Sequence, residues 1–89
     1  MGQQAINLAP VSIVIAADYE RTRNRYKNRT ERYVHMEAGH AAQNIYLQAT
    51  ALGLGTTAIG AFDDNGVKEL LSLTGNLQPL YIMPVGHAA

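Results

Sequence analysis

An apolar run rich in β-branched side chains extends from Val11 to Ala17, and only Ser12 interrupts it. Such a nearly continuous run is typical of a strand that is buried on both faces. Pro10, immediately before it, suits the start of a strand, because proline has no amide proton to give to a sheet. Asp18 follows the run and is predicted to cap a short polar helix that extends to about Lys27.

A much longer helix is predicted from about Thr30 to Leu52, with Asn28 or Thr30 as its N-terminal cap. Few charges follow Glu37, and apolar or small side chains occupy nearly every face, so we expect this helix to be buried on several sides. The positions that carry the pattern are Tyr33, Val34, Met36, Ala38, Ala41, Ala42, Ile45, Tyr46, Ala49 and Leu52. Gly53 is predicted to end the helix in the left-handed conformation.

The rest of the chain predicts three shorter elements. They are a strand over Gly55–Gly60, a small helix from about Asn65 to Leu73, and a strand over Gln78–Gly86. Val67, Leu70 and Leu71 are expected to form one apolar face of the small helix. The resulting order, β-α-α-β-α-β without internal repeats, indicates an α+β or α/β sandwich in a single unit covering residues 1–89.

The composition suggests that this unit needs more buried surface than it can supply alone. Eighty-nine residues form one domain at most, and a chain this short buries a small share of its surface. Apolar residues make up 47% of the chain, so we expect it to fold, but it has no cysteine and therefore no disulfide to support a small core. A partner subunit is the obvious remaining way to bury more surface.

The formal net charge is zero, which argues against nucleic acid or a membrane surface as a partner. The first ten residues lack the basic and apolar regions of a secretory signal, and the run after Pro10 is too short to span a bilayer. We therefore expect a cytoplasmic protein.

Charge is nevertheless unevenly distributed, because six of the seven basic residues lie between Arg21 and Arg32. Asp18, Glu20 and Glu31 are interleaved with them, so a solvated charged face is favoured over a site for polyanions. In the same region tyrosines recur every seven residues, at positions 19, 26 and 33, as expected where a helix face packs against a neighbour.

The glycines at 53, 55 and 60 superficially resemble a dinucleotide-binding fingerprint. That fingerprint needs a strand, a glycine turn and then a helix, whereas these glycines lie between a predicted helix and a predicted strand and have the wrong spacing. A helix end followed by a tight entry into a strand explains Gly53 and Gly55 fully. It does not explain Gly60.

Two other motifs resemble metal sites but lack some of the ligand residues that such sites require. Glu37 and His40 form a Glu-x-x-His pair, yet a di-iron bundle needs two such pairs and further carboxylates. The stretch Asp63–Gly66 resembles part of a calcium loop, but alignment on its glycine puts Ala61 and Ser72 at the positions that require acidic ligands. Helix capping by Asp63 or Asp64 is favoured instead, and we predict neither a metal site nor a catalytic side chain.

Taken together, four blocks resemble the C-terminal half of nitroreductase-family flavoproteins. They are Ala9–Ala16, Glu37–Ala49, Ala51–Asp63 and Tyr81–Gly86. Their order and spacing are similar over nearly the whole chain, and within the family the sequence looks most like the SagB-type dehydrogenases, relatives of the thiazole/oxazole-forming oxidases.

The resemblance implies an α+β flavoprotein fold and a homodimer formed through the long helix around Glu31–Leu52, with FMN bound at the subunit interface. The small residues Gly39, Ala42 and Ala49 are expected at the closest approach of the two helices.

The same resemblance implies that the segment Ala58, Ile59, Gly60 and Ala61 runs along the flavin ring with its backbone N–H groups facing the ring. A backbone that approaches a flat ring closely tolerates little side chain, which would explain Gly60. The flavin would pass a hydride from NAD(P)H or another donor to a small organic acceptor.

The sequence also departs from the family pattern. Family members are longer, and they hold the FMN phosphate with an Arg/Ser-rich segment in the N-terminal part that nothing in residues 1–10 matches. Lysine or arginine ligands that many members place beyond the Pro-Val-Gly strand have no counterpart before Ala89. The alternative is therefore a non-catalytic remnant or dimerisation module that lacks the phosphate-binding segments.

Overall fold

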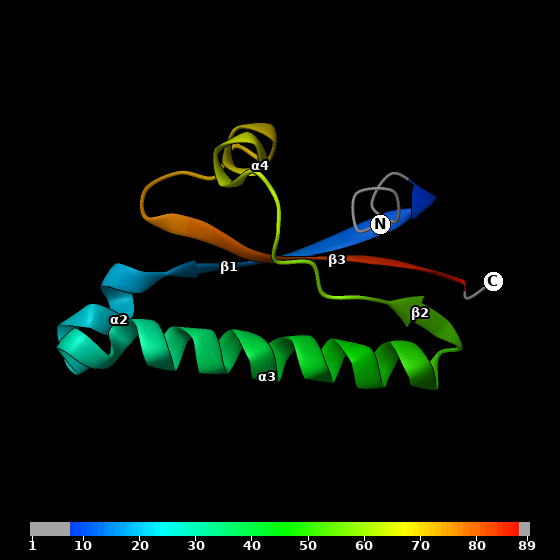
Figure 1. Ribbon diagram of the computed structural model, residues 1–89, viewed down its shortest axis with the longest axis horizontal. Coiled ribbons are helices and arrows are strands. Elements are labelled where there is room, and N and C mark those ends of the chain that lie inside the picture. The colour runs from blue at the N-terminus through cyan, green and yellow to red at the C-terminus, as the bar shows by residue number, and fades with distance from the viewer. Residues whose placement is uncertain (1–7, 88–89) are drawn as a thin grey trace.

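The structure is a computed structural model, and it describes residues 8–87. Its helices and strands follow one another in the predicted order, with one 3-10 turn in addition (Figure 1). The elements are β1 (Val11–Asp18), α2 (Tyr19–Tyr26), η1 (Lys27–Arg29), α3 (Thr30–Ala51), β2 (Leu54–Thr56), α4 (Asp64–Leu70) and β3 (Leu77–His87). The α+β fold class predicted from the sequence is confirmed.

The three strands form one antiparallel sheet in the order β1-β3-β2, so the last strand of the chain lies in the middle. Val11 pairs with Val85 at one end of β1, and Asp18 pairs with Leu77 at the other. The register shifts between Ile15 and Ala16, which places one extra residue on β3. β1 is an edge strand of this sheet.

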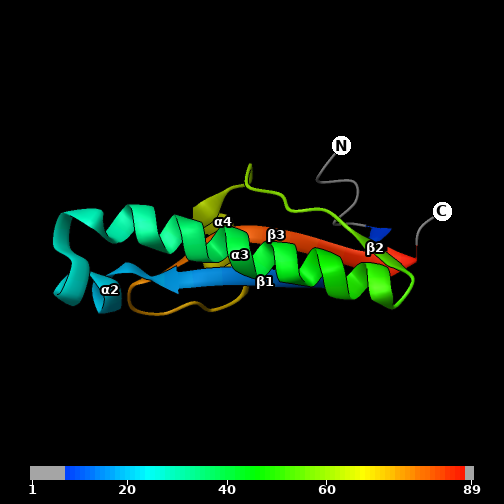
Figure 2. The same ribbon diagram turned by 90° about the horizontal axis from the view of Figure 1, so that it is seen from below.

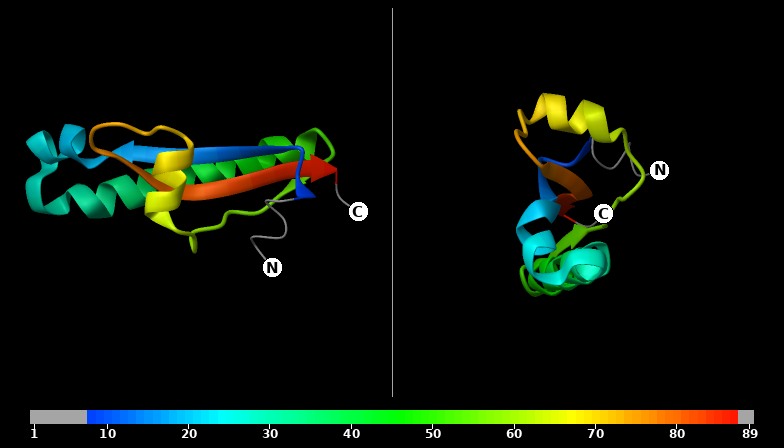
Figure 3. Two further views of the ribbon diagram at one scale, coloured as in Figure 1. Left: turned by 90° about the horizontal axis from the view of Figure 1, so that it is seen from above. Right: turned by 90° about the vertical axis from the view of Figure 1, so that its left-hand side faces the viewer.

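The long helix α3 runs along one face of the sheet, and α4 lies on the opposite side (Figures 1 and 3). Seen from below, α3 follows the length of β1 and β3 (Figure 2). Its buried side chains are mostly small, and Met83 of β3 is completely buried. The buried apolar positions are Val34, Ala38, Ala42 and Ala49 of α3 and Ile82 and Met83 of β3. Small residues on α3 therefore allow the helix to approach its own sheet closely.

This packing corrects two expectations for buried surfaces. β1 is not buried on both faces, because Val11, Ser12 and Ile13 are exposed, and only part of each sheet face is covered. The helix α3 is not buried on several sides either, since Met36 and Leu47 are 53% and 61% exposed. The local sequence pattern shows that a side chain is apolar, but it does not show whether another helix or strand covers that side chain.

The start of α2 is capped as predicted, because the Asp18 carboxylate accepts a hydrogen bond from the Glu20 amide at 3.0 Å. The predicted caps of α3, Asn28 and Thr30, are wrong. Arg29 occupies the cap position without a side-chain hydrogen bond, because η1 leads directly into α3 with helical backbone angles. Thr30 is instead the first residue of α3, and its hydroxyl donates to the Lys27 carbonyl at 2.6 Å.

The seven-residue spacing of Tyr19, Tyr26 and Tyr33 reflects the packing of α2 against α3. The Tyr26 and Tyr33 rings meet edge to face with centroids 4.9 Å apart, and the Tyr19 ring meets His35 at 5.9 Å. The Tyr19 hydroxyl also lies 2.8 Å from Nε2 of His35. The predicted packing of this tyrosine face is therefore confirmed.

The glycine that ends α3 is also confirmed, because Gly53 has a φ of 73°. The second strand is shorter than predicted: β2 ends at Thr56, and beyond it Ile59 alone bridges to Ile82. The small helix α4 ends at Leu70 rather than near Leu73, and Leu70 itself is 83% exposed. The expected apolar face of α4 therefore covers little of the sheet.

Candidate cofactor site

The predicted cofactor-binding residues lie on the connection between β2 and α4, which passes along the sheet before it reaches α4 (Figure 1). Two successive residues hold this connection in place. The Ala58 amide donates to the Tyr46 hydroxyl of α3 at 2.6 Å. The Ile59 amide donates to the Ile82 carbonyl at 2.9 Å, and the Ile82 amide donates back to Ile59 at 3.0 Å. Ala58 and Ile59 therefore use their N–H groups inside the chain.

Gly60 and Ala61 differ from the two residues before them. Both are exposed, and within residues 8–87 neither amide donates a hydrogen bond to the protein. The four predicted residues are contiguous, but only these two present backbone N–H groups that remain free for a ligand.

The chain itself gives no reason for a glycine at position 60. Its φ is not positive, and a Cβ built there would meet only the Tyr81 ring, at an ordinary contact distance of 3.8 Å. The backbone could therefore hold alanine at this point without internal strain. Any requirement for a residue without a side chain comes from outside the described chain.

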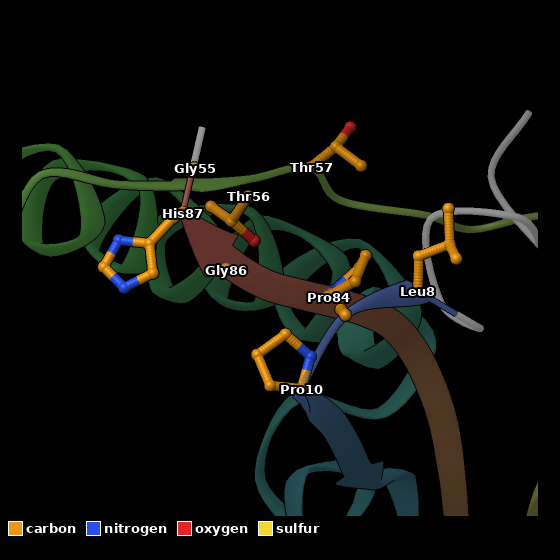
Figure 4. A pocket seen from close by; sticks show the side chains of 9 residues that line it. Leu8, Pro10, Gly55, Thr56, Thr57, Pro84, Gly86 and His87 are labelled. Atoms are coloured by element: carbon orange, nitrogen blue, oxygen red, sulfur yellow. The ribbon is translucent and has the colours of Figure 1, made fainter. Parts of the chain in front are cut away.

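A cavity of about 320 Å³ opens at the β2 end of the sheet, next to the start of this connection (Figure 4). Three segments line it: the residues ahead of β1, the end of β2 with Thr57, and the end of β3. Thr56 contributes a buried hydroxyl oxygen that has no hydrogen-bond partner in the described part of the chain. Gly86 allows Pro10 to approach, since a Cβ there would lie 3.2 Å from the proline Cδ.

The lining of this cavity is poor in charge. Among residues 8–87, His87 is the only lining residue with an ionisable side chain, and no lysine or arginine of that range lines the cavity. The basic residues of α2, η1 and the start of α3 lie at the other end of the elongated molecule, whose longest extent is 44 Å (Figure 1). The cavity and the basic cluster therefore cannot act on one small ligand within a single chain.

Two ion pairs form among the ionisable groups of α2 and its cap. Arg21 and Arg23 pair with Asp18 and Glu20 at 3.6 and 3.1 Å, which accords with the predicted solvated charged face. Burial, followed by the negative charges of Glu31 and Asp64, raises the pKa of Tyr19 above its ordinary value. This tyrosine lies at the end of the molecule away from the cavity, so it has no part in the candidate site.

Within the described range no group of three histidine, cysteine, aspartate or glutamate side chains comes together as metal ligands would. No helix of that range is both long and apolar enough to cross a membrane.

The fold and the sequence both match one family of proteins. Residues 1–87 match the Nitroreductase family, and the chain belongs to that family. It is 55% identical over 85 residues to a candidate nitroreductase of Methanocaldococcus jannaschii, an alignment that covers 96% of this chain and 42% of that protein.

Solved structures agree with this assignment. A candidate nitroreductase of Anabaena variabilis superposes with a TM-score of 0.89 at 34% identity, over 99% of this chain and 18% of that one. A candidate nitroreductase of Ralstonia eutropha gives 0.81 at 28% identity, over 90% and 38%. A candidate NADH oxidase of Clostridium acetobutylicum gives 0.72 at 30% identity, over 91% and 48%. The chain thus spans less than half the length of these relatives.

Two residues of the site region are not singled out by the sequence pattern. Tyr46 belongs to the apolar pattern of the long helix, although a tyrosine at a half-buried position often carries a hydrogen bond at its polar tip. Thr56 belongs to a predicted strand, and nothing in the local pattern signals that its hydroxyl is buried without a partner in the described range.

Proposed function

We propose that this chain supplies the C-terminal part of an FMN-dependent oxidoreductase of the SagB-type dehydrogenase branch. When bound, the flavin would pass a hydride from a donor such as NAD(P)H to a small organic acceptor. Membership of the nitroreductase family supports this proposal, as does the similarity to a candidate NADH oxidase. A cytoplasmic location remains the prediction made from the sequence.

One observation supports the position of the flavin most strongly. Gly60 and Ala61 are exposed, their amides donate no hydrogen bond within the described chain, and the packing of that chain does not require glycine at position 60. Backbone amides can hydrogen-bond the polar edge of a flavin ring and tune its electronics. Gly60 and Ala61 would hold the ring, whereas Ala58 and Ile59 would fix the backbone that carries them.

The residues present fit the ring of FMN better than its phosphate. A phosphate is normally held by Arg, Lys or several backbone amides, and among the described residues no Arg or Lys lines the cavity beside the site. We propose that the phosphate contacts come from the remainder of the nitroreductase fold, which the relatives contain and this chain does not span.

The experiment uses the longest natural form of the protein that contains these residues. We expect the purified protein to show the visible absorption of a bound flavin, or to acquire it when FMN is added. A protein that stays colourless with added FMN would overturn the proposal.

We also propose a homodimer through α3, as the family resemblance implies. The outward side of α3 exposes Met36 and Leu47, and Gly39 faces open space there, because an added Cβ would have nothing within 4 Å. Met36 and Leu47 lie about three turns apart on this side of the helix, and an interface between two copies of α3 would cover both. The expectation that Ala42 and Ala49 lie at the helix–helix contact is wrong, because both are buried against the sheet of their own chain.

The second candidate function is a non-catalytic dimerisation module or remnant. The observation that favours it is that no lysine or arginine of the described residues lines the cavity. Titration of FMN into the 89-residue chain separates the two functions. Micromolar binding with quenching of flavin fluorescence supports a working site in this chain, and no binding supports the module.

A further inference from the structure

Tyr46 connects the long helix to the candidate cofactor segment. Its hydroxyl oxygen accepts the Ala58 N–H at 2.6 Å in a part-buried setting. The turn at Gly53 and the short strand β2 bring the chain back so that Ala58 lies beside α3. This is the only side-chain acceptor of a backbone amide on the connection between β2 and α4 in the described residues.

The contact matters because of the residues that come next along the chain. Ala58 is fixed to α3 through Tyr46, and Ile59 is fixed to β3 through Ile82. Peptide planes are rigid, so two anchored residues in succession leave few soft dihedral angles before Gly60. Because the Ile59 carbonyl accepts from Ile82, the Ile59–Gly60 peptide plane and the Gly60 N–H are held by β3, and Tyr46 holds the chain two residues earlier, at the Ala58 N–H.

We infer that Tyr46 is a positioning residue of the flavin site, which acts by holding the segment that presents the Gly60 and Ala61 amides. The inference rests on the proposed function. Tyr46 acts through Ala58 and not on the flavin, so it is not a catalytic residue.

The hydroxyl, and not the ring, carries this role. A phenylalanine would fill the same space between α3 and the connection, but it would leave the Ala58 amide without its acceptor. An amide that loses its acceptor in a part-buried position is stabilised by a hydrogen bond to water instead. Its segment therefore samples other conformations that expose the amide. Tyr46→Phe therefore separates packing from positioning.

The test compares Tyr46→Phe with Tyr33→Phe in the longest natural form of the protein. Tyr33 is a matched control, because it lies on the same helix, packs its ring against Tyr26, and has no hydrogen bond from its hydroxyl in the described part of the chain. Three quantities are measured: amide hydrogen exchange, FMN affinity by fluorescence quenching, and the visible spectrum of the bound flavin.

For Tyr46→Phe we expect exchange at Ala58 and Ile59 to become about tenfold faster while core amides near Met83 are unchanged. We also expect FMN affinity to fall about tenfold, with a shift in the flavin spectrum, because the ring-facing amides are no longer held in one direction. Tyr33→Phe should change none of these quantities.

Several results would overturn the inference. Unchanged exchange at Ala58 would mean that the hydrogen bond does not hold the segment. Equal acceleration at Ala58 and at core amides would make Tyr46 a general stability residue. Faster local exchange with unchanged FMN affinity and spectrum would remove the positioning role but leave the proposed function intact. Failure of the unchanged protein to bind FMN would instead overturn the proposed function, and the inference with it.

Discussion

Ile59 and Ile82 exchange two backbone hydrogen bonds, with N···O distances of 2.9 and 3.0 Å, three residues after β2 has ended. This single bridge brings the connection back to the central strand at one residue. The next two residues, Gly60 and Ala61, are exposed, and their amides donate no hydrogen bond within the described chain. Gly60 and Ala61 therefore project from the sheet at this bridge.

Gly60→Val should separate ligand binding from stability. The position is exposed, has no positive φ and offers room for a Cβ, so we expect the free energy of unfolding to change by less than about 0.5 kcal/mol. FMN affinity should fall by about tenfold or more if a flat ring approaches this backbone. Denaturant unfolding measures the free energy of unfolding, and FMN titration of the same preparation measures the FMN affinity. Equal FMN affinity in variant and wild type would place the flavin elsewhere.

Two methionines provide a matched pair for the core. Met83 is completely buried in the central strand, whereas Met36 is 53% exposed on the outward side of α3. Met83→Ala should lower the free energy of unfolding by about 2–5 kcal/mol, because it removes buried contacts and leaves a cavity. Met36→Ala should cost less than about 1 kcal/mol in a monomer. Denaturant unfolding at low protein concentration makes the comparison, and equal losses would mean that the sheet and helix are not packed as described.

The same residues show how far the sequence alone can predict this structure. Capping by Asp18, the left-handed end at Gly53 and the bounds of α3 depend on neighbouring residues, and these predictions are confirmed. The burial of β1 and α3 depends on which elements cover them, so an apolar pattern overstates it. That the segment from Ala58 to Ala61 contacts a flavin stays a prediction from the resemblance. The pairing of two of its amides with Tyr46 and Ile82 depends on contacts between distant parts of the chain, which no local pattern reveals.

Gly39→Ala should report whether a second copy packs on α3. In a monomer the substitution should stabilise the helix by about 1 kcal/mol, because Gly39 lies in a helix interior and a Cβ there meets nothing within 4 Å. In the proposed homodimer the added methyl group would instead crowd the helix–helix contact and raise the dissociation constant. Sedimentation of both proteins across a range of concentrations gives the answer. A stable wild-type monomer at micromolar concentration contradicts the dimer.

Tyr19 should make the protein sensitive to alkaline pH. Its pKa is raised in the folded state, chiefly by burial, so the folded chain holds this proton more tightly than the unfolded chain. The resulting stability is present below the unfolded pKa of about 10 and is lost as pH rises through the higher folded pKa. Tyr19→Phe should flatten the fall in unfolding free energy as pH rises above about 9. An identical slope in Tyr19→Phe and wild type would contradict this assignment.

Whether this protein binds FMN is tested most directly by the visible absorption spectrum of the longest natural form that contains these residues, recorded before and after addition of FMN. We predict a protein-bound flavin spectrum for the wild type, and weaker binding of FMN by the Gly60→Val variant of the same protein. A wild-type protein that is folded, remains colourless with added FMN and does not quench flavin fluorescence would contradict the proposed FMN-dependent function.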